Sequence, residues 1–432
     1  MNEYRFIINN YHAIENADIS IDGITVIAGC NGCGKSTISK WLYALVNYTN
    51  EFNDLVDFRL LKRVNDEIRK MLRLNRSIGL GDENLFRRIK SLTPAVFDPD
   101  YSGYDKLYQQ FESRLNVFCQ AVDRAVGERN DDHFKKWVQR SLGTDDGLFG
   151  NYLTAYYDAT LSNVHDSIEH ALSMKNRRST DDLLTFIRKE LDIYGDAPRD
   201  FAFRENGLTL IDSVHFAPPF GLGNAIYIDT PMALSKHQSS DNYVWMRLMQ
   251  ALTEFRHEMP AAGRNLVARL ERIIGGDVLL RQDEFNDEPD IRYVRKKDGL
   301  NIPIEEAATG LKSFAYMLRL IENGFLDENS LLLIDEPEAH LHPQWIVEFA
   351  RILVLLNKEL GTKVMVASHN PDMIAALQSI SHAEGIDGMT RFYQACPDES
   401  GLRYSYEDLG NDIEKIFSSF NVALERIGYY GK

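Results

Sequence analysis

The stretch GCNGCGKST, Gly29 to Thr37, decides the fold because it fits the pattern G-x-x-x-x-G-K-[ST]. In such a phosphate-binding loop (P-loop), small residues let consecutive backbone N–H groups surround phosphates at the start of a helix. Lys35 is expected to reach the β and γ phosphates, and the Ser36 hydroxyl to bind Mg²⁺, which prefers hard oxygen ligands. The expected phosphate contacts are Asn31, Gly32, Cys33, Gly34, Lys35, Ser36 and Thr37.

The residues on both sides of this loop have the pattern of a strand and a helix. Residues 19–27 alternate before the loop, and residues 36–46 place Ile38, Leu42 and Leu45 at spacings of four and three. That spacing is typical of an amphipathic helix. The sequence therefore predicts a strand, a phosphate-binding turn and a helix in succession.

The chain changes character after residue 50. Residues 51–200 are mostly polar and helical in pattern, with Leu61, Val64, Ile68 and Met71 on one helix face. We expect this segment to form a helical insertion lobe, and residues 1–50 and 200–432 to form one head. The dipeptides Asn206-Gly207 and Asp298-Gly299 indicate hairpins with type I′ turns, which we expect to frame a second β-rich lobe.

The C-terminal part returns to alternating strands and helices. Apolar runs at LLLIDEP and KVMVASH, separated by helical patterns, predict buried parallel strands and an α/β fold with a mixed sheet. The first run delivers Asp335 and Glu336 to the carboxyl edge of the sheet, where open α/β sheets bind ligands. One carboxylate can hold Mg²⁺ while the next activates the attacking water.

Two further segments place polar residues at the start of a helix or the end of a strand. Thr309 and Gly310 open a helix, whose N-terminus favours anions, although an isolated Thr-Gly is more often a simple helix cap. His369 follows the strand KVMVASH, where it could contact a γ-phosphate or the attacking water, although a lone histidine in this place is usually structural.

The order of these motifs resembles the head of ABC-type ATPases, in the branch with Rad50, RecF, the structural-maintenance proteins and the overcoming-lysogenization-defect (OLD) ATPases. TGLKS looks like a degenerate signature motif, DEPEAHLHP like a Walker B with its D-loop, and SHNPDM like a switch-histidine segment. DEPEAHLHP is also similar to the anti-phage ATPases grouped with PtuA and AriA. The signature lacks the second glycine and the glutamine of transporter-type motifs, and neither FDPDYSGY nor AIYIDTP offers a Q-loop glutamine.

The resemblance implies ATP and Mg²⁺ as cofactors, with Ser36 and Asp335 at the metal and Lys35, Glu336 and His369 as catalytic residues. It also implies a homodimer in which Thr309 and Gly310 of one chain cap the ATP bound by the other. Higher oligomers stay open. Tyr11 is the candidate adenine platform. His340 and His342 fall where a D-loop would cross the interface, which we favour over a metal site.

Composition limits the class of protein. The net charge of −16 means that nucleic acid could bind only at a local basic patch, such as the run from Arg59 to Arg76. We favour a solvated helix face for that run because it lacks interleaved aromatics. Cys30 and Cys33 fill variable P-loop positions, and we favour this interpretation over a zinc site, which would need two further ligands. Such cysteine usage suggests a reducing compartment. No signal peptide or long apolar run is seen, so we expect a cytoplasmic protein without a membrane partner.

Three hypotheses for function follow. The first is an ATP-driven switch of bacterial anti-phage defence that controls a separate effector, a nuclease or a toxin. About sixty residues follow His369, too few for the TOPRIM nuclease of full OLD proteins, so we expect another polypeptide to carry that activity. The second is a DNA-repair ATPase that acts directly on duplex DNA. The third is an ATP-binding scaffold with little hydrolysis.

Overall fold

The computed structural model describes residues 3–78, 83–93, 103–143, 152–191, 195–229, 243–283, 286–418 and 429. Backbone contacts divide the chain into two units. The head unit comprises Met1–Asn50 and Ser179–Lys432, and the helical unit comprises Glu51–Arg178. The chain thus rejoins the head unit at Ser179, before helix α7 (Thr180–Glu190), whereas the sequence suggested residue 200.

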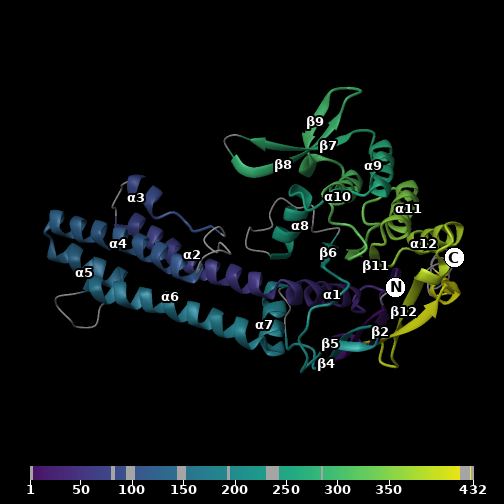
Figure 1. Cartoon of the computed structure of the whole chain (residues 1–432), viewed down its shortest axis with the longest axis horizontal. Helices are drawn as coiled ribbons and strands as arrows, with labels where there is room; N and C mark the ends of the chain where they lie inside the picture. The colour runs from purple at the N-terminus through teal and green to yellow at the C-terminus, as the bar shows by residue number, and fades with distance from the viewer. Residues whose placement is uncertain are drawn as a thin grey trace. The chain divides into compact units, whose positions relative to one another are not determined.

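The head unit is built on a mixed sheet in which ten described strands run in the order β5-β4-β1-β2-β13-β12-β3-β11-β10-β6. The five strands from β12 to β6 are parallel, whereas β5, β4, β1 and β2 form an antiparallel half. Figure 1 shows both halves, and the strands are β1 (Tyr4–Tyr11), β2 (Ile14–Ser20), β3 (Ile24–Ala28), β4 (Asp200–Glu205), β5 (Leu208–Ile211), β6 (Asn224–Asp229), β10 (Ser330–Asp335), β11 (Lys363–Ser368), β12 (Thr390–Pro397) and β13 (Tyr404–Gly410). The expected α/β fold class with a mixed sheet is confirmed.

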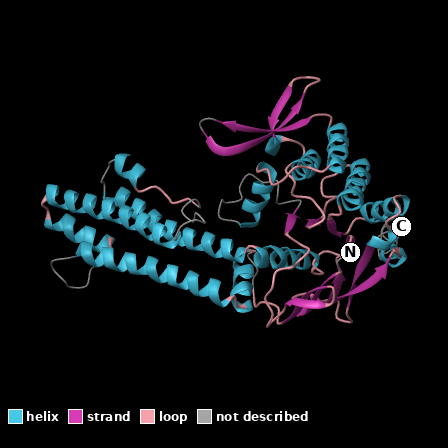
Figure 2. Ribbon diagram, in the orientation of Figure 1, coloured by secondary structure: helices cyan, strands magenta, loops and turns pink. Residues whose placement is uncertain are grey.

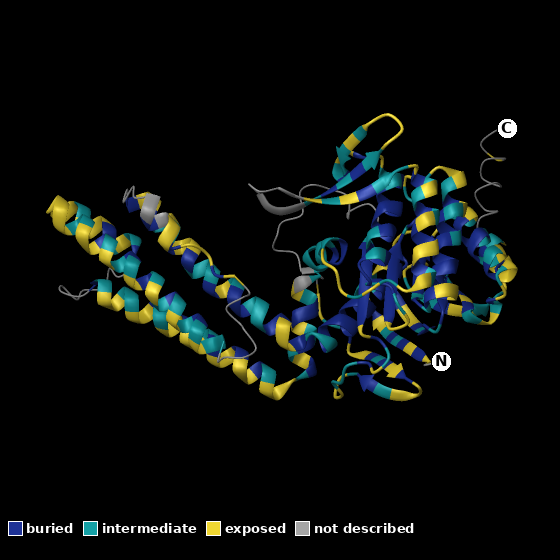
Figure 3. Ribbon diagram, turned by 45° about the horizontal axis from the view of Figure 1, so that its top comes forward, coloured by how far each residue is buried: buried dark blue, intermediate teal, exposed yellow. Residues whose placement is uncertain are grey.

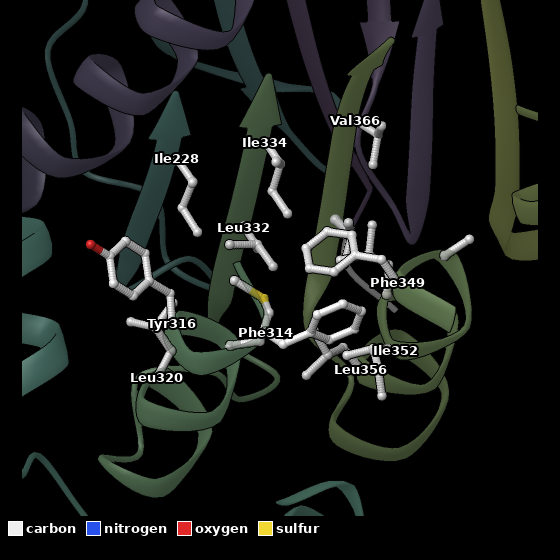
Figure 4. Packing of buried hydrophobic residues seen from close by; sticks show 14 of the residues in the cluster. Ile228, Phe314, Tyr316, Leu320, Leu332, Ile334, Phe349, Ile352, Leu356 and Val366 are labelled. Carbon is white, nitrogen blue, oxygen red and sulfur yellow. The ribbon is translucent and has the colours of Figure 1, made fainter. Parts of the chain in front are cut away.

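The parallel strands are buried on both faces, which explains their continuous apolar runs. Side chains alternate between the faces of a strand, so neighbours such as Tyr227 and Ile228 on β6 point opposite ways. Tyr227 meets Tyr43 of helix α1 (Lys35–Asn50), with ring centroids 6.0 Å apart. Ile228 belongs instead to the apolar cluster that Figure 4 shows against helices α10 (Thr309–Glu322) and α11 (Pro343–Leu360).

Further helices complete the apolar layer on the α10 side. They are α8 (Tyr243–Thr253), α9 (Ala261–Ile274) and α12 (Pro371–Ala383). Phe314 of α10 packs edge-on against Phe349 of α11, with centroids 5.3 Å apart. In Figure 3 the central strands are dark blue along their length, as expected for the middle layer of a three-layer head. This packing fixes the strand ends that carry the candidate site.

Both predicted hairpins form, but they belong to different sheets and only the first has the predicted type I′ turn. At the second, Gly299 has a positive φ and Asp298 does not, and residues 296–299 form the connection, so the predicted type I′ turn is wrong there. Asn206 and Gly207 have φ of 50° and 78°, as a type I′ turn requires, and join β4 to β5. Strand β4 pairs with β1, so this hairpin extends the main sheet. The second hairpin joins β8 (Asn286–Arg295) to β9 (Leu300–Pro303) in a separate sheet with β7 (Asp277–Asp283). The expectation that the two hairpins frame one lobe is therefore wrong.

The described part of the helical unit consists of helices, as Figure 2 shows. The predicted apolar face of helix α2 is buried, with Leu61, Val64, Ile68 and Met71 each 5% exposed or less. This face packs against the long helices α4 and α6. The bounds are α2 (Phe52–Ile78), α3 (Glu83–Arg88), α4 (Gly103–Arg129), α5 (Asp132–Ser141) and α6 (Tyr152–Arg177).

The C-terminal part of the described chain forms a hairpin between β12 and β13. Residues 414–418 follow this hairpin as a short helical segment. None of the helices in the described part of the chain combines the length and apolar character needed to cross a bilayer.

Candidate nucleotide-binding site

The P-loop lies between the buried strand β3 and the first turn of α1. Gly34 has a φ of 101°, and a Cβ atom at this position would lie 2.7 Å from Cγ1 of Ile14. Only glycine fits both the backbone conformation and the space. The first turn of α1 begins directly afterwards, with the Ile38 N–H donating to the Gly34 carbonyl at 3.1 Å. The free N–H groups of this helix start therefore open onto the loop.

Lys35 is folded back over its own loop. Its Nζ donates to the carbonyl oxygens of Gly29 and Cys30, both at 2.9 Å. The amine is thus held by carbonyl groups of the loop itself, and a bound phosphate would offer its own oxygens in place of these carbonyls. Asn31, Gly32 and Ser36 are exposed, and Thr37 is half-buried. Among the predicted phosphate contacts, Cys33 has a buried side chain, so only its backbone can face a ligand.

Asp335 lies at the end of β10 and is 3% exposed. Its carboxylate accepts hydrogen bonds from Ser39 Oγ at 2.7 Å and from Tyr227 Oη at 3.0 Å. Burial raises the pKa of Asp335, and hydrogen bonds from Ser39, Ser36 and Tyr227 oppose that rise. Ser36 lies near enough to Asp335 to lower its pKa, and the two side chains would offer a pair of hard oxygen atoms. This hard oxygen pair fits Mg²⁺, which commonly keeps several waters and takes one or two protein carboxylates.

A second carboxylate, which we did not predict, lies beside Asp335. Strands β6 and β10 are parallel, and Asp229 pairs in register with Asp335. Burial raises the pKa of Asp229, Lys40 lowers it, and the nearby carboxylates of Asp335 and Glu336 raise it further. The segment AIYIDTP contains this aspartate where we looked for a glutamine, so a search for any polar residue after that strand would have found it.

Glu336 and His369 come together from neighbouring strands. Asp335 pairs with Ala367 across β10 and β11, so the residues after each strand end lie side by side. His369 Nδ1 is 3.4 Å from Glu336 Oε1. Glu336 has a φ of 50°, a left-handed conformation that costs a non-glycine residue free energy and often marks a functional site. The Glu336 N–H donates to the Ala367 carbonyl at 2.8 Å, which holds this conformation.

Glu338 is a further acid that the sequence analysis missed. Its side chain is 5% exposed and lies 3.8 Å from His369 Nδ1, measured from Oε1. The same oxygen accepts hydrogen bonds from Ser368 Oγ at 2.7 Å and from the His369 N–H at 3.3 Å. Burial raises the pKa of Glu338, and the Ser368 hydroxyl opposes that rise.

Thr309 and Gly310 lie at the start of α10, where Ala308 is the N-cap and Thr309 the first helical residue. Gly310 is buried, and a Cβ atom there would lie 2.9 Å from both Leu341 Cδ2 and Trp345 Cε3. Close packing therefore explains this glycine. No hydrogen bond between described residues joins either position to the P-loop of the same chain. The ligand that Thr309 and Gly310 were expected to share with a P-loop therefore remains a proposal.

The remaining candidate residues make packing or capping contacts, or are exposed, and do not form a further ligand site among the described residues. Tyr11 is 5% exposed and packs edge-on against Trp41 at 5.8 Å, so its ring face is not free to stack on a base. His342 caps α11 by accepting from the Gln344 N–H at 3.4 Å, and His340 is exposed. Cys30 and Cys33 are both free thiols. Groups of three or more potential metal ligands from histidine, cysteine or acidic side chains are absent from the described residues.

These features together define a P-loop ATPase domain of the ABC type. Residues 24–375 match the family model described as "AAA domain, putative AbiEii toxin, Type IV TA system". This match covers most of the chain, and the chain belongs to that family. The resemblance to ABC-type and OLD-type ATPases is thereby confirmed at the level of the domain.

Curated relatives match over shorter stretches. The ATP-binding protein EcfA3 of an energy-coupling factor transporter from Clostridium perfringens is 33% identical over 72 residues, 16% of this chain and 25% of its own. The Old nuclease of Escherichia phage P2 is 31% identical over 96 residues, 22% of this chain and 14% of its own. The matched stretch therefore spans a quarter or less of these relatives.

Solved structures with a similar fold include the Smc head domain with a coiled coil and joint derived from Pyrococcus yayanosii. It is 10% identical with a TM-score of 0.38, covering 98% of this chain and 100% of its own. The ADP conformation of MJ1267, an ATP-binding cassette of an ABC transporter, is 9% identical with a TM-score of 0.36 over 99% of each chain. These scores are too low to support any inference about this chain.

Proposed function

We propose that this chain is an ATP-hydrolysing switch that closes as a homodimer on ATP and controls a separate effector, a nuclease or a toxin, in bacterial anti-phage defence. The observation that carries the ATPase part is the approach of His369 Nδ1 to Glu336 Oε1, 3.4 Å, beside the Asp335 carboxylate and the P-loop. The family description as a putative toxin and the similarity to a phage Old nuclease support the link to defence.

The proposed chemistry is phosphoryl transfer to water. The P-loop N–H groups and Lys35 hold the phosphates, and Glu336 accepts a proton from the attacking water as its oxygen bonds to the γ-phosphorus. The bond from that phosphorus to the bridging oxygen breaks, and ADP leaves with the electron pair. Ser36 and Asp335 would hold Mg²⁺, which neutralises charge on the phosphate oxygens. His369 would contact the γ-phosphate or the water.

The homodimer is proposed because no hydrogen bond among the described residues joins the start of α10 to the P-loop of its own chain. The first turn of a helix favours an anion, and the N-cap of α10, Ala308, makes no side-chain hydrogen bond that would cap this turn. A second copy related by a twofold axis would bring its triphosphate to Thr309, and each copy would complete the other's site. Loss of the γ-phosphate would then remove the bridge between the two chains.

Phosphate release by purified protein tests the ATPase activity. We expect turnover by wild type, a loss of about 10² to 10⁴ in Glu336→Gln, and no nucleotide binding in Lys35→Ala. Glu359→Gln is the matched control, because Glu359 is an exposed carboxylate on α11. Equal rates in wild type and Glu336→Gln would refute hydrolysis at this site and favour the scaffold hypothesis.

Direct action on DNA is the second candidate, and one feature of α2 favours it. Arg63, Arg73 and Arg76 are exposed on this helix. Their neighbours Arg69 and Lys70 form ion pairs with Asp66 at 3.1 Å and Glu67 at 2.6 Å, which weakens the basic character of the face. Gel shifts over a salt series decide between the candidates: binding that falls steeply with salt, and that Arg73→Glu weakens, would favour DNA repair.

A further inference from the structure

We propose that Glu338 is the positioning residue of the hydrolytic pair: it fixes Ser368 and His369 so that the imidazole stands against the Glu336 carboxylate. The inference rests on the proposed ATPase function and extends it to a residue outside the expected site. Glu338 would not touch the reacting atoms. It would act through His369, and its effect would therefore depend on that histidine being present.

The turn after β10 directs Glu338 inward. The Ala339 N–H donates to the Glu336 carbonyl at 2.9 Å, and the Leu341 N–H donates to the Glu338 carbonyl at 3.0 Å. These bonds fold the chain back after Pro337, so the Glu338 side chain reaches the end of the neighbouring strand β11. The Glu338 side chain is 5% exposed, so its carboxylate contacts protein groups rather than solvent.

At the end of β11, Glu338 Oε1 is the centre of a small network. It accepts from Ser368 Oγ at 2.7 Å and from the His369 N–H at 3.3 Å. Ser368 Oγ in turn accepts from the Asn370 N–H at 3.0 Å. Three successive residues of the segment that carries His369 are therefore tied, directly or through one hydroxyl, to a single carboxylate oxygen.

One nitrogen of the imidazole, Nδ1, is near two acids. His369 Nδ1 is 3.4 Å from Glu336 Oε1 and 3.8 Å from Glu338 Oε1. Both distances are longer than a good hydrogen bond, so the attraction is chiefly between charges or dipoles. Such an arrangement favours a proton on Nδ1 and fixes the ring orientation, as a third group commonly does for a catalytic base. His369 itself is 45% exposed, so a ligand can reach its ring.

The second carboxylate oxygen of Glu338 lowers the stability of the folded protein. Glu338 Oε2 is buried without a hydrogen-bond partner among the described residues. A buried, unpaired carboxylate oxygen is unfavourable, and a glutamine or an apolar residue would avoid part of that cost. Destabilising groups such as this unpaired oxygen are found at functional sites more often than elsewhere in a protein. The carboxylate therefore serves His369 rather than the stability of the turn.

A double-mutant cycle tests the inference. Glu338→Gln keeps an oxygen that can accept from Ser368 and from the His369 N–H, but it removes the charge beside Nδ1. We expect kcat to fall roughly ten- to a hundredfold with the KM for ATP unchanged. In a His369→Ala background, the same substitution should change kcat less than twofold, because residues that act as a unit are not additive. Equal losses in both backgrounds, or no loss in either, would overturn the proposal.

The imidazole itself provides a readout that does not depend on turnover. The protein can be labelled with ¹⁵N at its 11 histidines, and the His369 signals identified by their loss in His369→Ala. We expect Nδ1 of His369 to be the protonated nitrogen in wild type, and both ring signals to move in Glu338→Gln but not in Glu359→Gln. Unchanged His369 signals in Glu338→Gln would also overturn the proposal.

These measurements separate the inference from the proposed function. An inactive wild type would contradict hydrolysis, and the His369 signals would still decide the role of Glu338. An active wild type with an impaired Glu336→Gln and a fully active Glu338→Gln would contradict only the positioning role.

Discussion

Tyr406 Oη donates a hydrogen bond of 2.9 Å to the carbonyl oxygen of Cys33, which ties strand β13 to the middle of the P-loop. Burial raises the pKa of Tyr406, so the hydroxyl stays protonated and remains a donor. The Cys30 thiol lies 3.3 Å from Tyr404 Oη on the same strand. The C-terminal hairpin therefore supports the loop at two points, although it follows the loop by more than 350 residues in sequence.

Tyr406→Phe should weaken ATP binding. The substitution removes one hydrogen bond that preorganises the loop, worth about 0.5–1.5 kcal/mol, and leaves the Cys33 carbonyl without that donor. We expect the Kd for ATP, measured by calorimetry, to rise by roughly three- to tenfold. Tyr404→Phe is the matched control with a smaller expected effect, since Cys30 is exposed. Unchanged affinity in Tyr406→Phe would show that the loop does not need this support.

Gly310→Ala should destabilise the head unit. The new methyl group would lie 2.9 Å from Leu341 Cδ2 and Trp345 Cε3, and overpacking of this kind typically costs about 1–3 kcal/mol. The free energy of unfolding in urea measures this loss.

Thr309→Ala is the companion variant, because Thr309 is half-exposed and makes no side-chain cap. It should leave the free energy of unfolding near that of wild type and weaken only ATP-dependent association. A stable Gly310→Ala would mean that the close packing at the start of α10 relaxes without cost.

Local patterns made the central part of the site predictable. The P-loop, Asp335 and Glu336 are short motifs at the ends of apolar strands, and parallel strands bring such ends to one edge of a sheet. Glu338 and Asp229 were not predictable in this way. Glu338 reaches His369 through a turn in which the Ala339 N–H donates to the Glu336 carbonyl, and Asp229 reaches Asp335 through the register of two strands about a hundred residues apart.

In the fold, too, a turn could be predicted from neighbouring residues, whereas the pairing of strands far apart in sequence could not. The Asn206-Gly207 turn is encoded by two residues, and the hairpin forms as expected. Its placement depends on pairing between β4 and β1, which are nearly 200 residues apart, and no local pattern contains that information. Tyr11 illustrates the same limit, because only the packing of α1 against it shows that its ring is covered by Trp41.

Glu338→Gln should be more stable than wild type at neutral pH while being slower. Burial raises the pKa of Glu338 above its ordinary value of 4.5, so the folded state holds this proton more tightly than the unfolded state. Stability is therefore lost as the pH rises from 4.5 through the raised pKa, and the loss persists above it. Glutamine carries no charge and avoids that loss.

Thermal unfolding over a pH series checks this prediction. The Tm of Glu338→Gln should exceed that of wild type at pH 8, and the difference should shrink toward zero near pH 4, where Glu338 is protonated in both states. A Tm difference that does not vary with pH would contradict the assignment of a buried, charged Glu338.

The mass of Glu336→Gln in solution tests the central claim most directly. With the proton acceptor removed, ATP and Mg²⁺ should remain bound, and the protein should sediment at twice the 49.5 kDa of one chain, whereas with ADP it should sediment as a monomer. Adding Thr309→Ala to this variant should reduce the dimer. A Glu336→Gln protein that binds ATP and yet stays monomeric at micromolar concentration would contradict the account.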